Sequence, residues 1–236
     1  MIYLTAALTQ SLTPATLPGA VRAALGKPLR RAAPLTQLAV VGALACLPPD
    51  RRHLPTALLW QTTGGPRAET QLLLEEICQG PAEPMPYDFL ATQPAIAAAQ
   101  LKPFLPGLRA ATCCPLDSPG VANWSMLLCL AGNWLEEGRF AQILCAHLEH
   151  GATAVEGHWL ALSASPLENS LTSLQLTSQA APAALPDTAD FPLRLAQWVA
   201  APDTPVLQLC AAVGQIQAVE FAQPQPSREH HVPIRL

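Results

Sequence analysis

Two adjacent cysteines, Cys113 and Cys114, and one serine, Ser118, stand where covalent chemistry could begin. The cysteines end a strand-like run, and Ser118 lies between that run and a helix-like run. A thiol at the amino end of a helix is activated because nearby N–H groups stabilise the thiolate. A serine at the same place needs a histidine base, and the next histidine along the chain is His147. Helix capping is therefore the simpler role for Asp117 or Ser118.

Three histidines, His147, His150 and His158, fall close together around the end of a strand-like run. Imidazole is a common metal ligand, but the spacing of these three matches no common metal site. We expect them to be surface histidines, and we expect His230 and His231 to lie in a solvated tail. Several carboxylates near helix and strand ends are also expected to be solvated: Glu136, Glu137, Glu149 and Glu156.

The composition describes a globular protein and excludes several functional classes. The 236 residues are 50% hydrophobic and 13% charged, which leaves ample material for a buried core. The formal net charge is −4, and the longest basic runs are pairs such as Arg30 and Arg31, so binding to a nucleic-acid backbone is not expected. Seven cysteines without a C-x-x-C pair predict free thiols in a reducing cytoplasm.

No membrane anchor is expected from the sequence. The longest uncharged apolar run, 35–49, is too short to cross a bilayer. An alternative is a lipoprotein export signal, in which Arg30 and Arg31 precede an apolar stretch that ends at Cys46. The polar, proline-containing stretch before this segment argues against that alternative.

Strand-like and helix-like runs alternate along the chain up to Pro166, after which the sequence turns polar and proline-rich. This alternation predicts an α/β fold with a mixed, mostly parallel sheet and helices on both faces. A breaker-rich loop is expected at 13–19. The expected strands are 2–8, 56–62, 108–114, 141–148 and 158–165. The expected helices are 67–79, 92–101, 121–137 and one that runs from 34 to the prolines at 48 and 49. Two shorter apolar segments follow at 192–200 and 206–213.

Three short stretches occur in an order that resembles one protein family. They are Ala33-Pro34-Leu35-Thr36-Gln37-Leu38-Ala39, Phe89-Leu90-Ala91-Thr92-Gln93 and Gly107-Leu108-Arg109. With these stretches the chain resembles the amino-terminal half of the β-ketoacyl synthases, and more specifically the short synthase-like proteins of aryl polyene pathways. The resemblance covers residues 1–165 and implies a thiolase-like fold whose carboxyl-terminal half is truncated. It leaves 166–223 as a reduced remnant of the second half or a cap, and 224–236 as a tail.

The resemblance also indicates which catalytic groups this chain lacks. The family's nucleophile falls near Pro119 or Gly120, at the start of the expected helix 121–137, and no cysteine stands there. Cys113 and Cys114 come too early, on the expected strand, where buried apolar packing is the common role of cysteine. The family's catalytic histidines belong to its carboxyl-terminal half. We therefore expect no catalytic residue, no metal site and no cofactor of the chain's own.

By resemblance, the chain is expected to be a silent subunit of the chain-length-factor kind. Such a subunit forms a heterodimer with an active β-ketoacyl synthase and shapes its tunnel for the acyl chain, which acyl carrier protein delivers on a phosphopantetheine arm. The expected interface strand consists of Arg109, Ala110, Ala111, Thr112, Cys113 and Cys114. The expected tunnel wall consists of Phe89, Thr92, Gln93, Ala95, Ala98 and Ala99.

Two other functions are open from the sequence. In the first, Cys113 or Cys114 is a real acyl acceptor, and the chain is an active condensing enzyme or acyltransferase. In the second, the chain is a homodimeric scaffold or a docking subunit for acyl carrier protein, without influence on the length of the acyl chain.

Overall fold

The structure, a computed structural model, describes residues 1–80, 85–116, 122–168 and 170–223. Its centre is one eight-stranded sheet with the strand order β3-β2-β4-β5-β1-β6-β8-β7. The strands are β1 (Ile2–Leu12), β2 (Thr56–Thr62), β3 (Leu108–Pro115), β4 (Gln142–His150), β5 (Val155–Ser163), β6 (Thr172–Thr177), β7 (Val206–Val213) and β8 (Ile216–Ala222). The helices are α1 (Leu17–Leu25), α2 (Pro34–Cys46), α3 (Arg67–Gln79), α4 (Pro86–Ala91), α5 (Ala95–Leu101), α6 (Trp124–Glu136) and α7 (Phe191–Ala200), with a short 3-10 helix at Pro49–Arg51.

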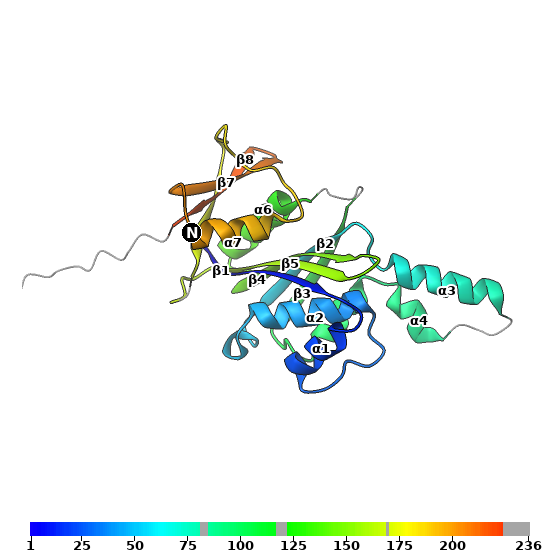
Figure 1. Ribbon diagram of the computed structural model, residues 1–236. Coiled ribbons are helices and arrows are strands. Elements are labelled where there is room, and N and C mark those ends of the chain that lie inside the picture. Colours follow the sequence, from blue (N-terminus) through cyan, green and yellow to red (C-terminus); the bar gives the residue numbers. More distant parts are fainter. Residues whose placement is uncertain (81–84, 117–121, 169, 224–236) are drawn as a thin grey trace, which may run out of the picture.

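Helices cover both faces of the sheet, with α1, α2 and α5 on one face and α6 and α7 on the other (Figure 1). All seven residues of β2 are buried. Ala57 and Leu59 belong to the core under α6 and α7, whereas Leu58 and Trp60 belong to the core under α2. A strand covered on both faces is a continuous apolar run for this reason. The mixed α/β class with helices on both faces is confirmed.

The expectation of a mostly parallel sheet is wrong. β2 pairs in parallel with β3 and β4, whereas the other pairings between the eight described strands are antiparallel. Parallel neighbours need a crossover, and helices supply one between β2 and β3 and between β3 and β4. β4 and β5 are instead joined by a tight turn, in which Gly151 N donates to the carbonyl oxygen of Ala154 at 2.9 Å. β1 then lies antiparallel to β5.

Prolines account for two differences between the expected and observed helices. The helix expected at 92–101 begins only at Ala95, because Pro94 occupies its N-cap position and the chain before it turns. The stretch 13–19, expected to be a loop, contains the start of α1. Pro18 lies in the first turn of α1, where its missing N–H breaks no helical hydrogen bond.

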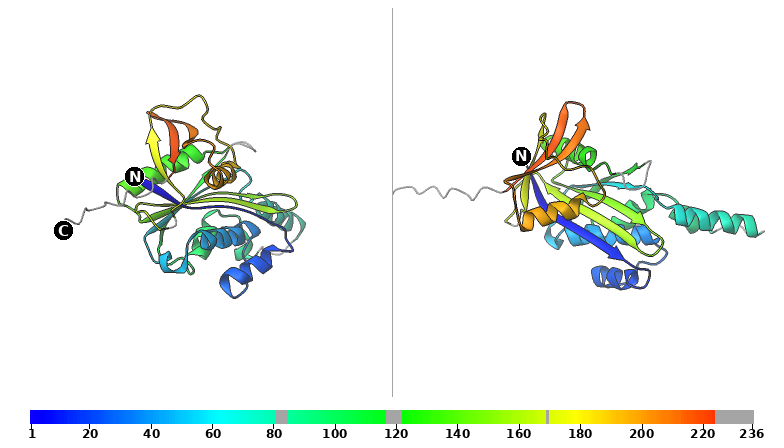
Figure 2. Two further views of the ribbon diagram at one scale, coloured as in Figure 1. Left: turned by 60° about the vertical axis from the view of Figure 1, so that its left-hand side comes forward. Right: turned by 45° about the horizontal axis from the view of Figure 1, so that its top comes forward.

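Residues 166–223 extend the same sheet as the residues before them. They contribute β6, α7, β7 and β8, and β6 joins the sheet through a short pairing with β1, from Ile2–Leu174 to Leu4–Thr172. Figure 2 shows β6, β7 and β8 turned away from the rest of the sheet. The expected tail, 224–236, lies outside the described residues.

Helices α3 and α4 project from the body beyond the end of β2, and we call these two helices the arm (Figures 1 and 2). Leu73 is the buried residue of α3, and α4 has no buried residue. Among the described residues, the exposed large apolar side chains lie on or next to the arm, apart from Met1 and Leu193. They are Leu72, Leu74, Ile77, Met85, Tyr87, Phe89 and Leu90.

Helix α2 lies very close to the sheet. It is buried over most of its length, yet none of the helices in the described ranges has the length and apolar content that crossing a membrane requires. The close approach depends on Gly42, because a Cβ atom there would lie 2.2 Å from Cε2 of Trp159 on β5. Trp159 is itself fully buried and fills the space that a side chain would need. Glycine is therefore required at position 42 by contact with the sheet rather than by backbone conformation.

We expect Gly42→Ala to destabilise the fold by about 2 kcal/mol, because the overpacking cost exceeds the gain in helix propensity. Gly19→Ala in α1 is the matched control, since nothing lies within 4 Å of its added Cβ. That control should stabilise the protein by up to about 1 kcal/mol. Chemical denaturation of the two variants and the wild type measures both effects. Equal stabilities of the two variants would contradict the packing described for α2.

Candidate functional site

The site expected from the resemblance lies at the amino end of α6. This helix is buried against the sheet, so its first N–H groups need acceptors from the protein itself. The expected nucleophile positions, Pro119 and Gly120, and the expected capping residues, Asp117 and Ser118, lie outside the described residues. The described site therefore begins at Ala122.

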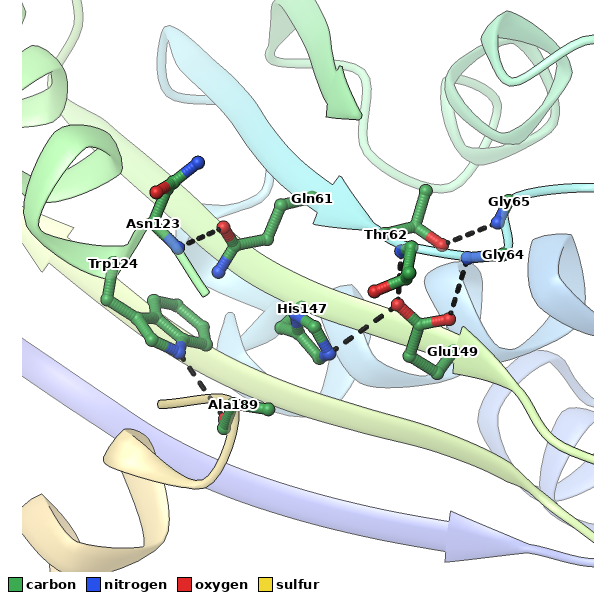
Figure 3. A network of polar contacts seen from close by, with 10 residues as sticks. Gln61, Thr62, Gly64, Gly65, Asn123, Trp124, His147, Glu149 and Ala189 are labelled. Carbon is green, nitrogen blue, oxygen red and sulfur yellow. Dashed lines mark hydrogen bonds and ion pairs between the residues drawn. The ribbon is translucent and has the colours of Figure 1, made fainter. Parts of the chain in front are cut away.

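Asp187 binds the amino end of α6. Its Oδ1 accepts a hydrogen bond from Trp124 N at 2.9 Å, and its Oδ2 accepts bonds from Ser125 N at 2.9 Å and from Ser125 Oγ at 2.7 Å. Just before the helix, Asn123 N donates to Gln61 Oε1 at 2.8 Å (Figure 3). The N–H groups of Asn123, Trp124 and Ser125, which could stabilise a thiolate or an oxyanion at this helix end, are thus already bonded to side chains of the same chain.

The segment that carries Asp187 is held over α6 by a second bond. Trp124 Nε1 donates to the carbonyl oxygen of Ala189 at 3.3 Å (Figure 3). Burial raises the pKa of Asp187, and the hydrogen bonds from Ser125 and Trp124 lower it in part. The positive end of the helix dipole also favours the anion. The carboxylate therefore takes the place at the helix end where a reacting anion would be stabilised.

A cavity of about 690 Å³ opens beside Asp187. Its lining comes from the start of α6, from the segment around Asp187 and from β7. Among the described lining residues, Asp187 and Cys210 are the titratable ones. A decarboxylative condensation needs a nucleophile with a paired base, and the described lining provides no histidine for that role.

Cys113 and Cys114 lie on β3 as register partners of Trp60 and Gln61 on β2. Both thiols are partly buried. Burial raises the pKa of Cys113 to about 11 and also raises the pKa of Cys114. Thiols of this kind are protonated at neutral pH and are weak nucleophiles. Neither cysteine belongs to the lining of the cavity beside Asp187.

His147 and His158 belong to a row of polar side chains that crosses four strands. The row consists of Gln61 on β2, His147 on β4, His158 on β5 and Thr9 on β1, which are register partners. The two imidazole centroids are 6.1 Å apart, and Thr9 Oγ1 lies 3.2 Å from His158 Nδ1. Burial lowers the pKa of both histidines, so both are neutral at pH 7. The expectation of a surface position is wrong for His147, which is only 4% exposed.

Glu149 is bonded rather than solvated, contrary to the expectation from the sequence. Its Oε1 accepts a hydrogen bond from Thr63 N, and its Oε2 accepts one from Gly64 N at 3.1 Å. Oε1 also lies 3.6 Å from His147 Nε2 (Figure 3). A pocket of about 330 Å³ lies here, between Arg67 and the two histidines. Within the described residues, no group of three or more His, Cys, Asp and Glu side chains is arranged to hold a metal ion.

The expected interface and tunnel-wall residues occupy two separate parts of the fold. The interface residues lie on β3, with Arg109, Ala111 and Thr112 exposed and with Ala110, Cys113 and Cys114 partly buried. The tunnel-wall residues lie on the arm and on the chain that returns from it: Phe89 on α4, Thr92 and Gln93 after it, and Ala95, Ala98 and Ala99 on α5. The roles assigned to both sets stay predictions.

Sequence reasoning missed Asp187 and Gln61. Asp187 lies in a polar, proline-rich stretch, and no local pattern links that stretch to a helix far earlier in the chain. Gln61 could have been found, because it is a single amide within the apolar run 56–62 that was expected to be buried on both faces. A polar side chain at such a position needs a specific partner, and here the partner is the backbone of Asn123.

Comparisons with solved structures identify the fold, whereas no protein-family model matches the sequence and no curated protein is significantly similar to it. A chain of the complex of the ketosynthase ApeO with its chain length factor ApeC from Xenorhabdus doucetiae is similar with a TM-score of 0.56 and 13% identity, over 94% of this chain and 99% of that chain. A chain of the ishigamide ketosynthase/chain length factor is similar with a TM-score of 0.63 and 12% identity, over 94% and 99%. The expected thiolase-like ketosynthase fold is confirmed.

We expect Asp187→Ala to lower the free energy of unfolding by about 2 kcal/mol, because several buried donors at the start of α6 lose their acceptor. The melting temperature should fall by roughly 6 °C. Thermal unfolding followed by circular dichroism measures this change. Glu168→Ala is the control, since Glu168 is an exposed loop carboxylate. Identical melting curves for the two variants would show that Asp187 does not hold the helix.

We expect Cys113 and Cys114 to be alkylated at least about tenfold more slowly than the exposed Cys78 and Cys210 at pH 8, because their thiolate fractions are small. With a pKa raised to about 11, the rate for Cys113 should keep increasing with pH up to that value. Timed iodoacetamide labelling with mass spectrometry of peptides measures all four rates. Fast labelling of Cys113 or Cys114 below pH 7 would instead identify an activated nucleophile.

Proposed function

We propose that this chain is a non-catalytic ketosynthase-like subunit, of the chain-length-factor kind, that forms a heterodimer with an active β-ketoacyl synthase. In this complex it shapes the tunnel that receives the growing acyl chain. The observation that carries the proposal is the edge strand β3, whose outer side no described segment covers, whereas the opposite edge strand, β7, is partly covered by a backbone bridge at Leu185.

The two edge strands of the sheet, β3 and β7, differ in whether another segment pairs with their outer side. On β7, Leu185 runs alongside the strand: its N–H donates to the Gln208 carbonyl oxygen at 2.7 Å, and its carbonyl oxygen accepts from Cys210 N at 2.9 Å. β3 pairs with β2 on one side, and no described strand lies on its other side. An open edge invites pairing with another chain. The side chains of Arg109 and Thr112 are exposed along this edge, which suits a partner strand.

The arm supplies a second surface that a partner would cover. Its exposed apolar side chains include Leu72, Ile77 and Phe89, and Phe89 is 58% exposed. Clusters of exposed apolar residues of this kind mark protein interfaces. In the proposal, Phe89 and the residues that follow it up to Ala99 form the tunnel wall, and β3 forms the subunit interface.

The amino end of α6 supports a silent role. Asp187 holds the N–H groups there, and the thiols of Cys113 and Cys114 have raised pKa values. Catalysis of condensation would therefore belong to the partner. All seven cysteines are free, which agrees with the cytoplasmic location that we include in the proposal.

Solved structures that share this fold include a ketosynthase in complex with its chain length factor and a ketosynthase/chain length factor. This supports a ketosynthase as the partner. In the proposal, the acyl chain, of a polyene or a fatty acid, reaches the partner on the phosphopantetheine arm of acyl carrier protein. The chain described here would contribute tunnel shape and stability and would bind no cofactor itself.

The test is co-expression with a ketosynthase from the same gene neighbourhood, followed by purification through a tag on this chain alone. We expect a one-to-one complex by light scattering, with condensing activity that survives Cys113→Ala together with Cys114→Ala. Thr112→Glu on β3 should weaken the complex at least about tenfold, because it places a charge in a buried interface. Leu193→Glu is the control, since Leu193 is exposed on α7, which packs on β1 and β5.

A stable monomer or homodimer that takes no ketosynthase would refute the proposal. Loss of condensation in the double cysteine variant, with the complex intact, would instead support the alternative in which a cysteine of this chain accepts the acyl group.

A further inference from the structure

The arm leaves the body through a very short junction after β2. Gly65 has a positive φ of 51°, and its N–H donates to Thr62 Oγ1 at 2.8 Å. Arg67 N then donates to the Gly64 carbonyl oxygen at 3.2 Å as α3 begins. Beyond this point α3 packs mainly against α4, and Leu73 is its buried residue. Two attachments therefore set the direction of the arm: this junction, and the return of α4 into α5, which packs on α2.

Glu149 binds this junction from the end of β4. Its two carboxylate oxygens accept the N–H groups of Thr63 and Gly64, which follow the last residue of β2 (Figure 3). A Cβ atom at Gly64 would lie 3.4 Å from Glu149 Oε2, so the backbone and the carboxylate are in contact. Each oxygen is matched to one donor. A glutamine at this position would keep one acceptor and would turn its NH₂ group toward the other N–H.

Two further contacts join the arm to the body. Glu69, in the first turn of α3, lies with Oε1 3.6 Å from Nδ1 of His150, the last residue of β4. The Glu69 side chain is only 10% exposed. At the other helix of the arm, the guanidinium of Arg31 lies 5.3 Å from the centre of the Tyr87 ring. The end of β4 thus contacts both the junction and the first turn of α3.

We propose that Glu149 is a positioning residue for partner docking: it fixes the direction of the arm, with Glu69 as the second contact, so that the apolar side chains of the arm meet the ketosynthase. This inference rests on the proposed function. Glu149 does not touch the partner in this proposal. It acts through the backbone of Thr63 and Gly64. A change at Glu149 can therefore weaken the complex by no more than the arm contributes to its stability.

The experiment compares Glu149→Gln with Glu156→Gln. Glu156 is the register partner of Glu149 across the β4–β5 hairpin and is exposed, and no hydrogen bond is found for it within the described residues. In Glu149→Gln, the amides of Thr63 and Gly64 should exchange hydrogen at least about tenfold faster, and the dissociation constant for the ketosynthase should rise about tenfold, since one charge-assisted hydrogen bond is lost. Glu156→Gln should change neither value. Glu69→Gln should act in the same direction as Glu149→Gln.

A double-mutant cycle with Phe89→Ser separates positioning from a general loss of structure. Phe89 is an exposed apolar side chain of the arm. If Glu149 acts through the arm, Glu149→Gln should weaken the complex less than about twofold once Phe89 has been replaced. Additive effects of the two substitutions would overturn the inference, as would unchanged affinity and exchange in Glu149→Gln.

The two proposals fail in distinguishable ways. A wild-type chain that takes no ketosynthase refutes the proposed function and with it the docking role of Glu149. A wild-type complex that Glu149→Gln leaves unchanged overturns only the role of Glu149, and the proposed function then stands.

Discussion

The amino end of α6 imposes the constraint on which much of the fold depends. A helix buried against the sheet cannot leave its first N–H groups to water, and an unpaired buried N–H is costly. Gln61, a residue of β2, accepts the hydrogen bond of Asn123 N. Asp187, which lies much later in the chain, accepts the hydrogen bonds of Trp124 N and Ser125 N. The chain after β6 must therefore return across α6. This return also places α7 and β7 on the same core.

The same return explains why the two edges of the sheet differ. The chain on its way to Asp187 passes β7 and pairs with it through Leu185, so the edge at β7 is partly covered within the molecule. Within the described residues, no corresponding segment pairs with the outer edge of β3, and the chain before β3 comes from α5, which packs on α2. Most of the exposed large apolar side chains of the described residues thus lie in the half of the fold that contains β3 and the arm.

Local patterns predicted the parts of the fold that depend on local physics. The buried run 56–62 and the proline-bounded helix from Pro34 are both present, because burial on two faces and the lack of a proline N–H act within a few residues. The pairing sense of β1 and β5 could not be predicted in this way. It depends on the tight turn at Gly151 and on which strand edge was free, and both are decided by the whole sheet.

In the candidate site, too, local sequence predicts some residues, whereas others depend on partners that are distant in the sequence. The partly buried position of Cys113 and Cys114 on β3 agrees with the expected strand. Glu149 was expected to be solvated, because a carboxylate at a strand end usually is. Its actual partners, Thr63 and Gly64, directly follow β2, a parallel neighbour of β4 that is distant in sequence. Asp187 was missed for the same reason, because β4, β5 and β6 lie between it and its partners on α6 in the sequence.

The contact between Gly42 and Trp159 has a consequence for the evolution of this sequence. The indole occupies the space in which any side chain at position 42 would have to lie, so the two positions cannot vary independently. A relative that carries alanine or a larger residue at position 42 must carry a smaller residue at position 159, or must hold α2 farther from the sheet. Covariation of these two columns would therefore trace how the helix-to-sheet distance has changed among sequences that have diverged too far to be aligned by identity alone.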